Sequence, residues 1–395
     1  MSDATFLTRV VLKNYKSIAT CDVRLGPLMF LVGPNGAGKS NFLDALRFVA
    51  DALRTSLDHA LRDRGGIGEV RRRSGGHPNH FGLRMEFVLP DGSRGVYAFR
   101  VGARPAGKYE VQDEECVLYG ARALSREAYF RVQAGRVSTS VPVSPAASTD
   151  RLYLVNASGL PEFRPVYEAF SRMGFYNLNP DRIRDLQSPD AGELLRRDGS
   201  NIASVLAQLE KHAGARKRRI VEYLANVVPG VHGVEVKVIG PKETLEFRQK
   251  VVASQPPWRF LAANMSDGTL RALGVLVSLF QAGNGGMPPV PLVGIEEPEA
   301  ALHPAAAGVL LDGLRDAGEF TQVLVTSHSP DILDDKDLDA ASILAVQTED
   351  GATRIAPLDE VGRSVVRDRL YTVGELLRLN QLRPDLQAIT EISEN

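Results

Sequence analysis

The sequence is poor in cysteine and has no excess of charge of either sign. Its 395 residues include two cysteines, Cys21 and Cys116, which lie far apart in the chain. Two such residues cannot form the framework of several disulfides that supports small secreted domains, so a reducing compartment is expected. The formal net charge of −1 gives no overall field that would attract nucleic acid or a membrane surface. Binding of either must therefore come from local patches.

Long apolar runs, a leader and internal repeats are also missing. The longest apolar stretches, such as "ALGVLVSLF" from Ala272, are far too short to span a bilayer. The first residues, "MSDATFLTRVV", lack the basic and then apolar pattern of a signal peptide. The chain shows no internal repeat and no sustained heptads, which excludes repeat arrays and long coiled-coil arms. Together these features predict a cytoplasmic protein that does not bind a membrane.

The chain has enough apolar residues, 44% of the total, for a large core in one bilobed or two adjacent domains. Residues 1–175 are predicted to form a first lobe, with a buried strand, a glycine-rich loop, a helix, and an antiparallel sheet between about residues 81 and 132. Residues 176–230 read as a helical insertion. Residues 231–395 alternate strand and helix, the pattern of a parallel sheet with crossover helices. The predicted fold class is α/β.

A phosphate-binding loop is the strongest signal in the sequence. "GPNGAGKS" matches G-x-x-x-x-G-K-[ST] in full, with Gly33, Gly38, Lys39 and Ser40 at the four fixed positions. The glycines allow backbone N–H groups to face a phosphate, and the helix that follows adds the positive end of its dipole. Lys39 is expected to reach the β- and γ-phosphates, and the Ser40 hydroxyl to bind Mg²⁺. An apolar strand before the loop and a helix after it support ATP and Mg²⁺ as ligands.

A second apolar strand ends in a group of acids. "PVPLV" leads directly into "GIEEPEAALHP", which places Glu296 and Glu297 at the strand end and Glu299 just beyond. Neighbouring carboxylates repel one another unless a cation or a reaction requires them. In a P-loop fold a neighbouring strand ends in an acid that binds Mg²⁺. Glu296 is predicted to take that role, and Glu297 to act as the general base or to orient the attacking water.

These motifs occur in a familiar order. The phosphate loop, "NMSDGTLRAL", "IEEPEAALHP" and "VTSHSP" have the order and spacing of ABC-type ATPases. The chain resembles the SMC/RecF branch, which includes the ATPase of overcoming-lysogenization-defect (OLD) nucleases and ATPases of phage-defence operons. The opening "VVLKNYKSI" and "SDGT" in place of the transporter signature are typical of that branch. The resemblance implies a bilobed ABC-type ATPase head, covering roughly residues 5–175 and 230–348.

The resemblance also implies roles for single residues. Ser266 and Gly268 would form the signature motif that touches the γ-phosphate held by a second subunit. His328, directly after the strand "TQVLVTS", would be the switch histidine near the γ-phosphate. His303 would either act near the chemistry or only shape its turn. ATP contacts are implied for the phosphate-loop residues Gly33, Asn35, Gly36, Gly38, Lys39, Ser40 and Asn41.

Two features depart from the family pattern. The acid on the Mg²⁺ side is usually Asp, and Glu296 is one methylene longer, so indirect coordination or slower turnover is expected. The glutamine that these ATPases use between their lobes has only weak candidates, Gln187 and Gln112.

Two basic clusters could contact DNA. The arginine segment, residues 62–73, contains Arg71, Arg72 and Arg73, and "KHAGARKRR" lies further along the chain. Such clusters suit DNA phosphates, but a solvated loop and a charged helix face explain them equally well. Aromatic residues are not interleaved with these charges, so base stacking is not indicated. "DDKDLDA" from Asp334 is interpreted as a solvated turn, and about sixty residues beyond it are too few for a fused nuclease domain.

The sequence therefore predicts an ATPase head that forms a homodimer around two ATP molecules and gates a separate effector, such as a Toprim-type nuclease, or a DNA clamp. Phage defence or DNA repair is the expected setting. Two alternatives stay open. One is a nucleotide-gated scaffold with negligible turnover, which the Glu296 substitution favours. The other is the nucleotide-binding subunit of a transporter, which "SDGT" and "LKNYKSI" disfavour.

Overall fold

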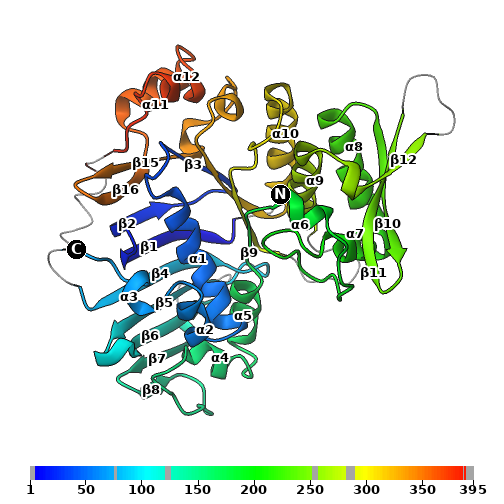
Figure 1. Cartoon of the computed structure of the whole chain (residues 1–395). Helices are drawn as coiled ribbons and strands as arrows, with labels where there is room; N and C mark the ends of the chain where they lie inside the picture. Colours follow the sequence, from blue (N-terminus) through cyan, green and yellow to red (C-terminus); the bar gives the residue numbers. More distant parts are fainter. Residues whose placement is uncertain are drawn as a thin grey trace. The chain divides into compact units, whose positions relative to one another are not determined.

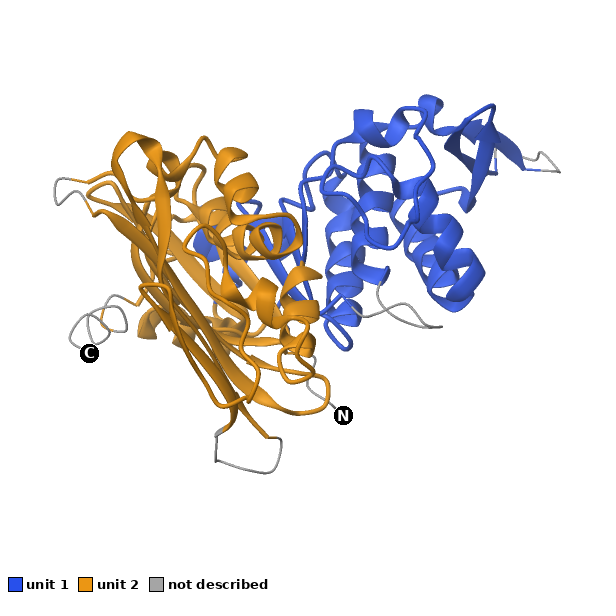
Figure 2. Cartoon of the chain, turned by 90° about the horizontal axis from the view of Figure 1, so that it is seen from below, with its two compact units in different colours: residues 1–4, 174–338, 371–378 blue, residues 5–173, 339–370, 379–395 orange. Residues whose placement is uncertain are grey.

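The computed structural model describes residues 5–74, 78–120, 126–250, 257–281, 290–385 and 387. The chain divides into two compact units, coloured separately in Figure 2. Unit 2 contains residues 5–173, 339–370 and 379–395, and unit 1 contains residues 174–338 and 371–378 together with residues 1–4.

Unit 2 is built on a large mixed sheet with the strand order β8-β7-β6-β5-β4-β1-β2-β16-β15-β3. Neighbours from β8 to β2 pair antiparallel, whereas β16 pairs parallel with β2 and β15 parallel with β3. The strands are β1 (Leu7–Tyr15), β2 (Ile18–Arg24), β3 (Leu28–Val32), β4 (His80–Val88), β5 (Arg94–Ala103), β6 (Tyr109–Tyr119), β7 (Arg126–Gln133), β8 (Arg136–Thr139), β15 (Ile343–Glu349) and β16 (Ala352–Pro357). The predicted antiparallel sheet is therefore present as β4–β7.

Helices α1, α2 and α5 pack together in unit 2 (Figure 1). The helices of this unit are α1 (Lys39–Arg54), α2 (Leu57–Arg62), α3 (Ile67–Val70), α4 (Tyr153–Ala157), α5 (Arg164–Ser171) and α11 (Glu360–Arg367), with 3-10 turns at Pro105–Gly107 and Ala340–Ser342. Alternate residues of β4 are buried, as expected for a strand with one covered face. Aromatic rings from the sheet and helices form the core. The ring centroids of Phe48 in α1 and Phe81 are 5.4 Å apart, and those of Phe170 in α5 and Phe87 are 5.3 Å apart.

A buried carboxylate joins β6 to the start of α4. Glu114 is 1% exposed and accepts hydrogen bonds from the Tyr97 hydroxyl, at 3.0 Å, and from the backbone N–H groups of Tyr153 and Leu154. Burial raises the pKa of Glu114 from 4.5 to about 7, although the three donors act in the opposite direction. Because the folded state holds the proton more tightly, this carboxyl destabilises the fold progressively as pH rises from about 4.5 to about 7.

We expect Glu114→Gln to remove this pH dependence. The amide cannot ionise, but its NH₂ group cannot accept a backbone N–H, so the variant should unfold more easily than wild type at pH 5. Between pH 5 and pH 8, the difference in unfolding free energy between wild type and the variant should decrease by an amount on the order of 3 kcal/mol. Urea unfolding of both proteins at pH 5, 6, 7 and 8 measures it. A difference that stays constant with pH would show that Glu114 does not titrate in this way.

The C-terminal part of the chain differs from the predicted domain limits. Residues 231–395 were expected to form one lobe, but residues 339–370 and 379–395 belong to unit 2. The reason is strand pairing: Leu344 of β15 lies in register with Leu31 of β3, and Thr353 of β16 with Ile18 of β2. The predicted helical insertion, residues 176–230, is likewise part of unit 1 and not a domain of its own.

Unit 1 contains a short parallel sheet, β14-β13-β9, and a separate antiparallel sheet, β10-β11-β12. Its strands are β9 (Gly174–Tyr176), β10 (Val231–Ile239), β11 (Lys242–Gln249), β12 (Trp258–Leu261), β13 (Leu292–Glu296) and β14 (Gln322–Ser327). Its helices are α6 (Pro180–Arg184), α7 (Ile202–His212), α8 (Gly214–Val227), α9 (Asp267–Phe280), α10 (Ala307–Ala317) and α12 (Val373–Arg378), with 3-10 turns at Ala262–Asn264, Pro304–Ala306 and Asp331–Leu333. Helix α9 is buried along most of its length and contacts α6, α7, α8 and α10.

Across the described residues, no helix is both long and apolar enough to cross a membrane.

Candidate functional site

The phosphate loop, residues 33–40, joins β3 to α1 and needs its glycines. Gly38 has φ +100°, and a Cβ there would lie 2.1 Å from the Thr353 hydroxyl oxygen. A Cβ on Gly33 would lie 2.0 Å from the carbonyl oxygen of Val346. Strands β15 and β16 therefore lie in close contact with the loop and restrict its backbone conformation. Asn35 and Gly36 lie exposed at its turn.

Lys39 is held inside this loop. Its side chain is 5% exposed, and Nζ donates to the carbonyl oxygens of Gly33, at 2.7 Å, and Pro34, at 3.0 Å. Ser40, the next residue, is exposed on the first turn of α1. A buried ammonium group beside the start of a helix, on a loop that only glycine can follow, fits a bound phosphate chain.

A chain of hydrogen bonds through two hydroxyl groups supports the phosphate loop, and it was not predicted from the sequence. Asn41 Nδ2 donates to Ser17 Oγ at 2.7 Å, and Ser17 Oγ lies 2.6 Å from Thr353 Oγ1. Thr353 in turn donates to the carbonyl oxygen of Ala37 at 2.9 Å. The Asn41 amide, predicted to contact ATP, is thus engaged with "NYKSI" in this structure. Thr353 lies more than 300 residues from the loop, so only the fold reveals the contact.

The acidic strand end, residues 296–299, lies in unit 1 beside the end of β14. Strands β13 and β14 are parallel, with Glu296 in register with Thr326, so the residues after both strands meet at one edge. This is the edge at which open α/β sheets bind ligands. Glu297 has φ +46°, a left-handed conformation that is uncommon for residues other than glycine and that occurs at functional sites.

Glu297 and His328, which were predicted separately as catalytic residues, lie in contact with each other. Glu297 Oε1 lies 3.0 Å from His328 Nδ1, and the two side chains are 37% and 40% exposed. A carboxylate only accepts hydrogen bonds, so this contact requires the tautomer of His328 that carries a proton on Nδ1. The bond therefore holds one carboxylate oxygen and leaves the other, Oε2, for a different partner.

Each of the other two acids has its own partner. Glu296 Oε1 is 2.7 Å from Arg197 Nη2, an ion pair that the sequence did not predict. Glu299 accepts a hydrogen bond of 2.5 Å from Ser327 Oγ, and burial raises the pKa of its carboxyl above the usual range. The three carboxylates thus point to three different groups, which relieves the repulsion among them.

Arg271 of α9 holds the backbone of the acidic strand end. Its Nη2 donates to the carbonyl oxygens of Glu296, at 3.3 Å, and Glu297, at 3.0 Å. Burial lowers the pKa of Arg271, while the neighbouring carboxylates act to raise it. This residue lies in "SDGTLRAL", one helical turn beyond the signature glycine, so α9 physically connects the signature motif to Glu297. The sequence offered only its place in that motif as a signal.

The signature residues lie at the start of α9. Ser266 is the exposed N-cap, whose Oγ accepts from Thr269 N at 3.2 Å. A Cβ on Gly268 would lie 2.6 Å from the carbonyl oxygen of Ala301, so glycine is required where the helix meets the loop after the acids. His303 caps the Pro304–Ala306 turn, since its Nδ1 accepts from Ala305 N at 3.2 Å. That contact matches the turn-shaping alternative for His303.

The two glutamine candidates are framework residues. Gln187 is 4% exposed, and its Oε1 accepts from Ala203 N at 3.0 Å within unit 1. Gln112 lies on β6, where its amide fills the space beside Gly102. Neither placement suits a residue that contacts nucleotide.

The arginine segment is more ordered than a loop, because α2 and α3 occupy part of it. Arg71 donates to the carbonyl oxygen of Pro78 and Arg72 to that of Ser17. Arg73 pairs with Glu69 and keeps 69% of its side chain exposed. Arg64 is buried and pairs with Asp44 and Asp51. Each of these arginines has an internal partner.

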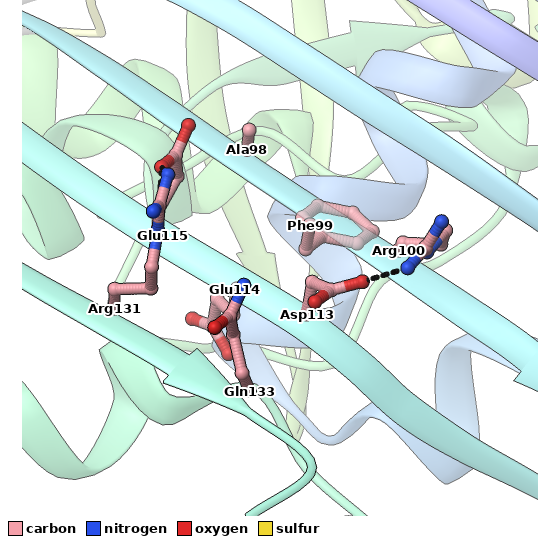
Figure 3. A pocket seen from close by; sticks show the side chains of 8 residues that line it. All are labelled: Ala98, Phe99, Arg100, Asp113, Glu114, Glu115, Arg131 and Gln133. Carbon is pink, nitrogen blue, oxygen red and sulfur yellow. Dashed lines mark hydrogen bonds and ion pairs between the residues drawn. The ribbon is translucent and has the colours of Figure 1, made fainter. Parts of the chain in front are cut away.

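A pocket of about 260 Å³ lies elsewhere, on β5, β6 and β7. Figure 3 shows its lining: Ala98, Phe99, Arg100, Asp113, Glu114, Glu115, Arg131 and Gln133. Arg100 pairs with Asp113 and Arg131 with Glu115, so both of its arginines are neutralised. None of the predicted nucleotide residues lines it, and we assign it no role in ATP binding.

Comparison with protein families gives a match to one segment in each unit. A family model described as "AAA domain, putative AbiEii toxin, Type IV TA system" matches residues 28–118 and 259–334. The first segment contains the phosphate loop, and the second contains the signature, the acidic strand end and His328.

The curated proteins to which this chain is similar include SMC and RecF proteins. The chain is 27% identical over 209 residues to the chromosome partition protein Smc of Desulfitobacterium hafniense (strain Y51), covering 48% of this chain and 17% of that protein. It is 33% identical over 108 residues to the DNA replication and repair protein RecF of Magnetococcus marinus (strain ATCC BAA-1437 / JCM 17883 / MC-1), covering 25% of this chain and 26% of that one. The matches thus span about a quarter or less of these relatives.

Solved structures share the fold. A SmcHead bound to the C-winged helix domain of ScpA superposes with a TM-score of 0.56 at 17% identity, covering 89% of this chain and 97% of that chain. The Smc head domain with an extended coiled coil, bound to the C-terminal domain of ScpA derived from Pyrococcus furiosus, gives 0.57 at 14% identity and covers 92% and 99%. The predicted α/β P-loop fold is confirmed.

Proposed function

We propose that this chain, which is similar in sequence to parts of SMC and RecF proteins and shares the fold of SMC heads, hydrolyses Mg-ATP and dimerises around two ATP molecules. The observation that carries the proposal is the Glu297–His328 pair, 3.0 Å apart directly after two parallel strands, in a chain with a complete phosphate loop.

The phosphate loop would bind the phosphates through its N–H groups and Lys39. Nζ would leave its carbonyl partners, Gly33 and Pro34, for the β- and γ-phosphates, which are stronger acceptors because they are charged. Gly33 and Gly38 keep the loop closed against β15 and β16 during this exchange.

Glu297 would take the proton of the attacking water. One oxygen is held by His328, so the other is free to accept that proton in a fixed direction. His328 would keep the carboxylate in place and sense the γ-phosphate. Arg271 would hold the backbone beneath Glu297 in its left-handed conformation.

The residues also fit Mg²⁺, which prefers oxygen ligands. The exposed hydroxyl of Ser40 in unit 2 and the carboxylate of Glu296 in unit 1 are each the kind of ligand this ion takes, and the ion would offset the charge on the phosphates. Glu296 has one oxygen engaged by Arg197, and its other oxygen is available to a water of the ion.

Dimerisation would bring Ser266 and Gly268 of one subunit to the γ-phosphate of the other. The exposed Ser266 at the start of α9 suits this contact. The SMC heads of known structure are bound to parts of ScpA, RecF is a DNA replication and repair protein, and the matching family model names a toxin–antitoxin system. On this basis we propose that ATP-driven association gates a separately encoded effector, such as a Toprim-type nuclease, in phage defence or DNA repair.

Size-exclusion chromatography with light scattering tests the association. The mass of the full chain should double with Mg-ATP, and phosphate release should accompany it. If the measured mass is the same with and without Mg-ATP and the protein releases no phosphate, the proposal is contradicted.

One observation favours a second function, a nucleotide-gated scaffold with negligible turnover. The Glu296–Arg197 ion pair holds the Mg²⁺-side carboxylate, and breaking it would slow the approach to a catalytic arrangement. ATP-dependent dimerisation without measurable phosphate release would select this alternative.

DNA contact by the arginine segment is a further proposal with its own prediction. Arg73→Ala should lower the log–log salt slope of DNA binding by about one, and replacing Arg71, Arg72 and Arg73 together by about three, if each binds a phosphate. Arg367→Ala is the matched control, since Arg367 is also 69% exposed and paired with an acid. Fluorescence anisotropy on duplex DNA with Mg-ATP, between 50 and 300 mM salt, measures the slope. A slope unchanged in the triple variant would assign these arginines to their internal partners alone.

A further inference from the structure

A short returning segment, residues 372–378, packs against the loop that carries His328. The chain leaves unit 1 after Leu338, and only residues 371–378 return to it. This segment contains α12, which contacts the Asp331–Leu333 turn. That turn begins three residues after His328, in what we call the His328 loop, residues 328–334.

Two ion pairs attach the segment to the loop. Arg378 Nη2 lies 3.1 Å from Asp331 Oδ1, and Arg378 Nη1 lies 2.9 Å from Asp334 Oδ2. Thr372 Oγ1 also donates to Asp334 Oδ1, at 2.7 Å. These donors lower the pKa of Asp334. One guanidinium group therefore spans the turn, and a second donor fixes one of its two acids.

The segment is itself rigid at the point of contact. Thr372 and Glu375 form a reciprocal cap, in which Thr372 N donates to Glu375 Oε2 at 2.8 Å and Glu375 N to Thr372 Oγ1 at 3.0 Å. Gly374 then lies so close that a Cβ would be 2.4 Å from the carbonyl oxygen of Pro330. A glycine is thus needed for the backbone of α12 to approach the residue two places after His328.

The His328 loop transmits this contact toward the acids. Asp331 N donates to Ser329 Oγ at 3.3 Å, and Ser329 N donates to Ser327 Oγ at 3.1 Å. Ser327 donates to Glu299, and His328 lies between these serines with its ring on Glu297. The loop is therefore fixed by Glu297 and Glu299 on one side and by residues 372–378 on the other.

We propose that Gly374 and Arg378 are positioning residues for ATP hydrolysis, which hold His328 against Glu297 through Pro330 and Asp331. This rests on the proposed function, because it assumes that the Glu297–His328 pair is catalytic. Both ends of the segment continue into chain that belongs to unit 2.

Gly374→Ala should lower kcat about tenfold, because the added methyl group displaces Pro330 and the histidine near it. Arg378→Ala should lower kcat several-fold, and Arg378→Lys should restore part of the loss, since lysine keeps one of the two ion pairs. The Kd for ATP should stay within about twofold of wild type, because the phosphate loop is untouched. Arg363→Ala is the control: Arg363 also pairs with two acids, Glu360 and Asp385, but lies on α11.

A second arm asks whether these residues act through His328. In a His328→Ala background, Gly374→Ala and Arg378→Ala should cause no further loss of kcat. Multiplicative losses in that background would overturn the proposal, as would parallel changes in kcat and the Kd for ATP. Should Gly374→Ala fail to fold, Arg378→Ala and Arg378→Lys still decide it.

A third experiment does not require ATP hydrolysis. Hydrogen–deuterium exchange of residues 327–334 in the full chain should be faster in Arg378→Ala than in wild type or Arg363→Ala. If wild type releases no phosphate, the proposed function fails, and exchange then decides whether the segment fixes the loop. Identical exchange in all three proteins would overturn the inference.

Discussion

Lys39→Ala should abolish tight ATP binding, with a loss of affinity of about 100-fold or more. Lys39 provides the mobile positive charge on phosphates that are otherwise bound by backbone dipoles. Its ammonium group is buried inside the loop, at 2.7 Å from one carbonyl oxygen and 3.0 Å from another, so the charge is already placed where the phosphates would bind. Isothermal titration calorimetry with ATP and Mg²⁺ measures the change.

The control is a lysine of unit 2 that takes no part in the loop. Lys16→Ala removes an ion pair with Asp44, at 2.6 Å, and should leave the Kd for ATP within about twofold. The melting temperature of Lys39→Ala shows whether the loss of the two carbonyl contacts has disturbed the fold. An unchanged Kd in a folded Lys39→Ala protein would refute the assignment of residues 33–40 as the phosphate site.

The sequence was sufficient where the signal is local. The strand before the phosphate loop, the helix after it, and the parallel strands that end at Glu296 and Ser327 all follow from apolar runs between glycine-rich or polar turns. The parallel arrangement of these two strands was also predicted, whereas the contact between Glu297 and His328 was not. Local pattern and chain direction together carried these predictions.

Contacts between distant residues could not be predicted in the same way. Arg197 lies 99 positions from Glu296, and Thr353 lies 316 from Ala37, so no spacing rule connects either pair. Nothing in the local sequence of residues 343–357 indicates that β15 pairs with β3 in unit 2. Nor does a run of arginines reveal that Arg71 and Arg72 donate to backbone carbonyl oxygens.

At the acidic strand end, contacts with distant residues change a prediction that was reasonable from the local sequence. Three acids within four residues predict a cation, yet each carboxylate has a protein partner here: Arg197, His328 or Ser327. Ser327 and His328 are consecutive residues at the end of β14, whereas Arg197 comes from a distant part of unit 1. Of the three, only Glu297 is paired with an imidazole ring, whose second nitrogen offers a further hydrogen-bonding position, and this distinguishes it chemically from its neighbours.

Glu297→Gln should therefore hydrolyse ATP about 10²–10⁴-fold more slowly than wild type and still bind it well. The amide oxygen can accept the hydrogen bond from His328 Nδ1, so the geometry of the pair survives, but the amide cannot take a proton from water. Lys39, Ser40 and Glu296 are unchanged, so the Kd for ATP should stay within about twofold. With hydrolysis blocked, the variant should accumulate as a dimer when Mg-ATP is present.

Ser266→Arg should behave in the opposite way, because a bulky side chain at the exposed N-cap of α9 blocks the contact with a second subunit. It should bind ATP on each subunit and remain unassociated. Glu349→Gln is the control for the loss of one carboxylate at a strand end, since Glu349 closes β15 in unit 2 and pairs only with Arg354 among the described residues. Phosphate release and light scattering, with and without Mg-ATP, separate the three variants. Wild-type turnover by Glu297→Gln would mean that the base is another residue. If wild type is already a dimer without ATP, cross-linking between heads replaces mass as the readout, and Glu297→Gln should then hold the heads closer than Ser266→Arg.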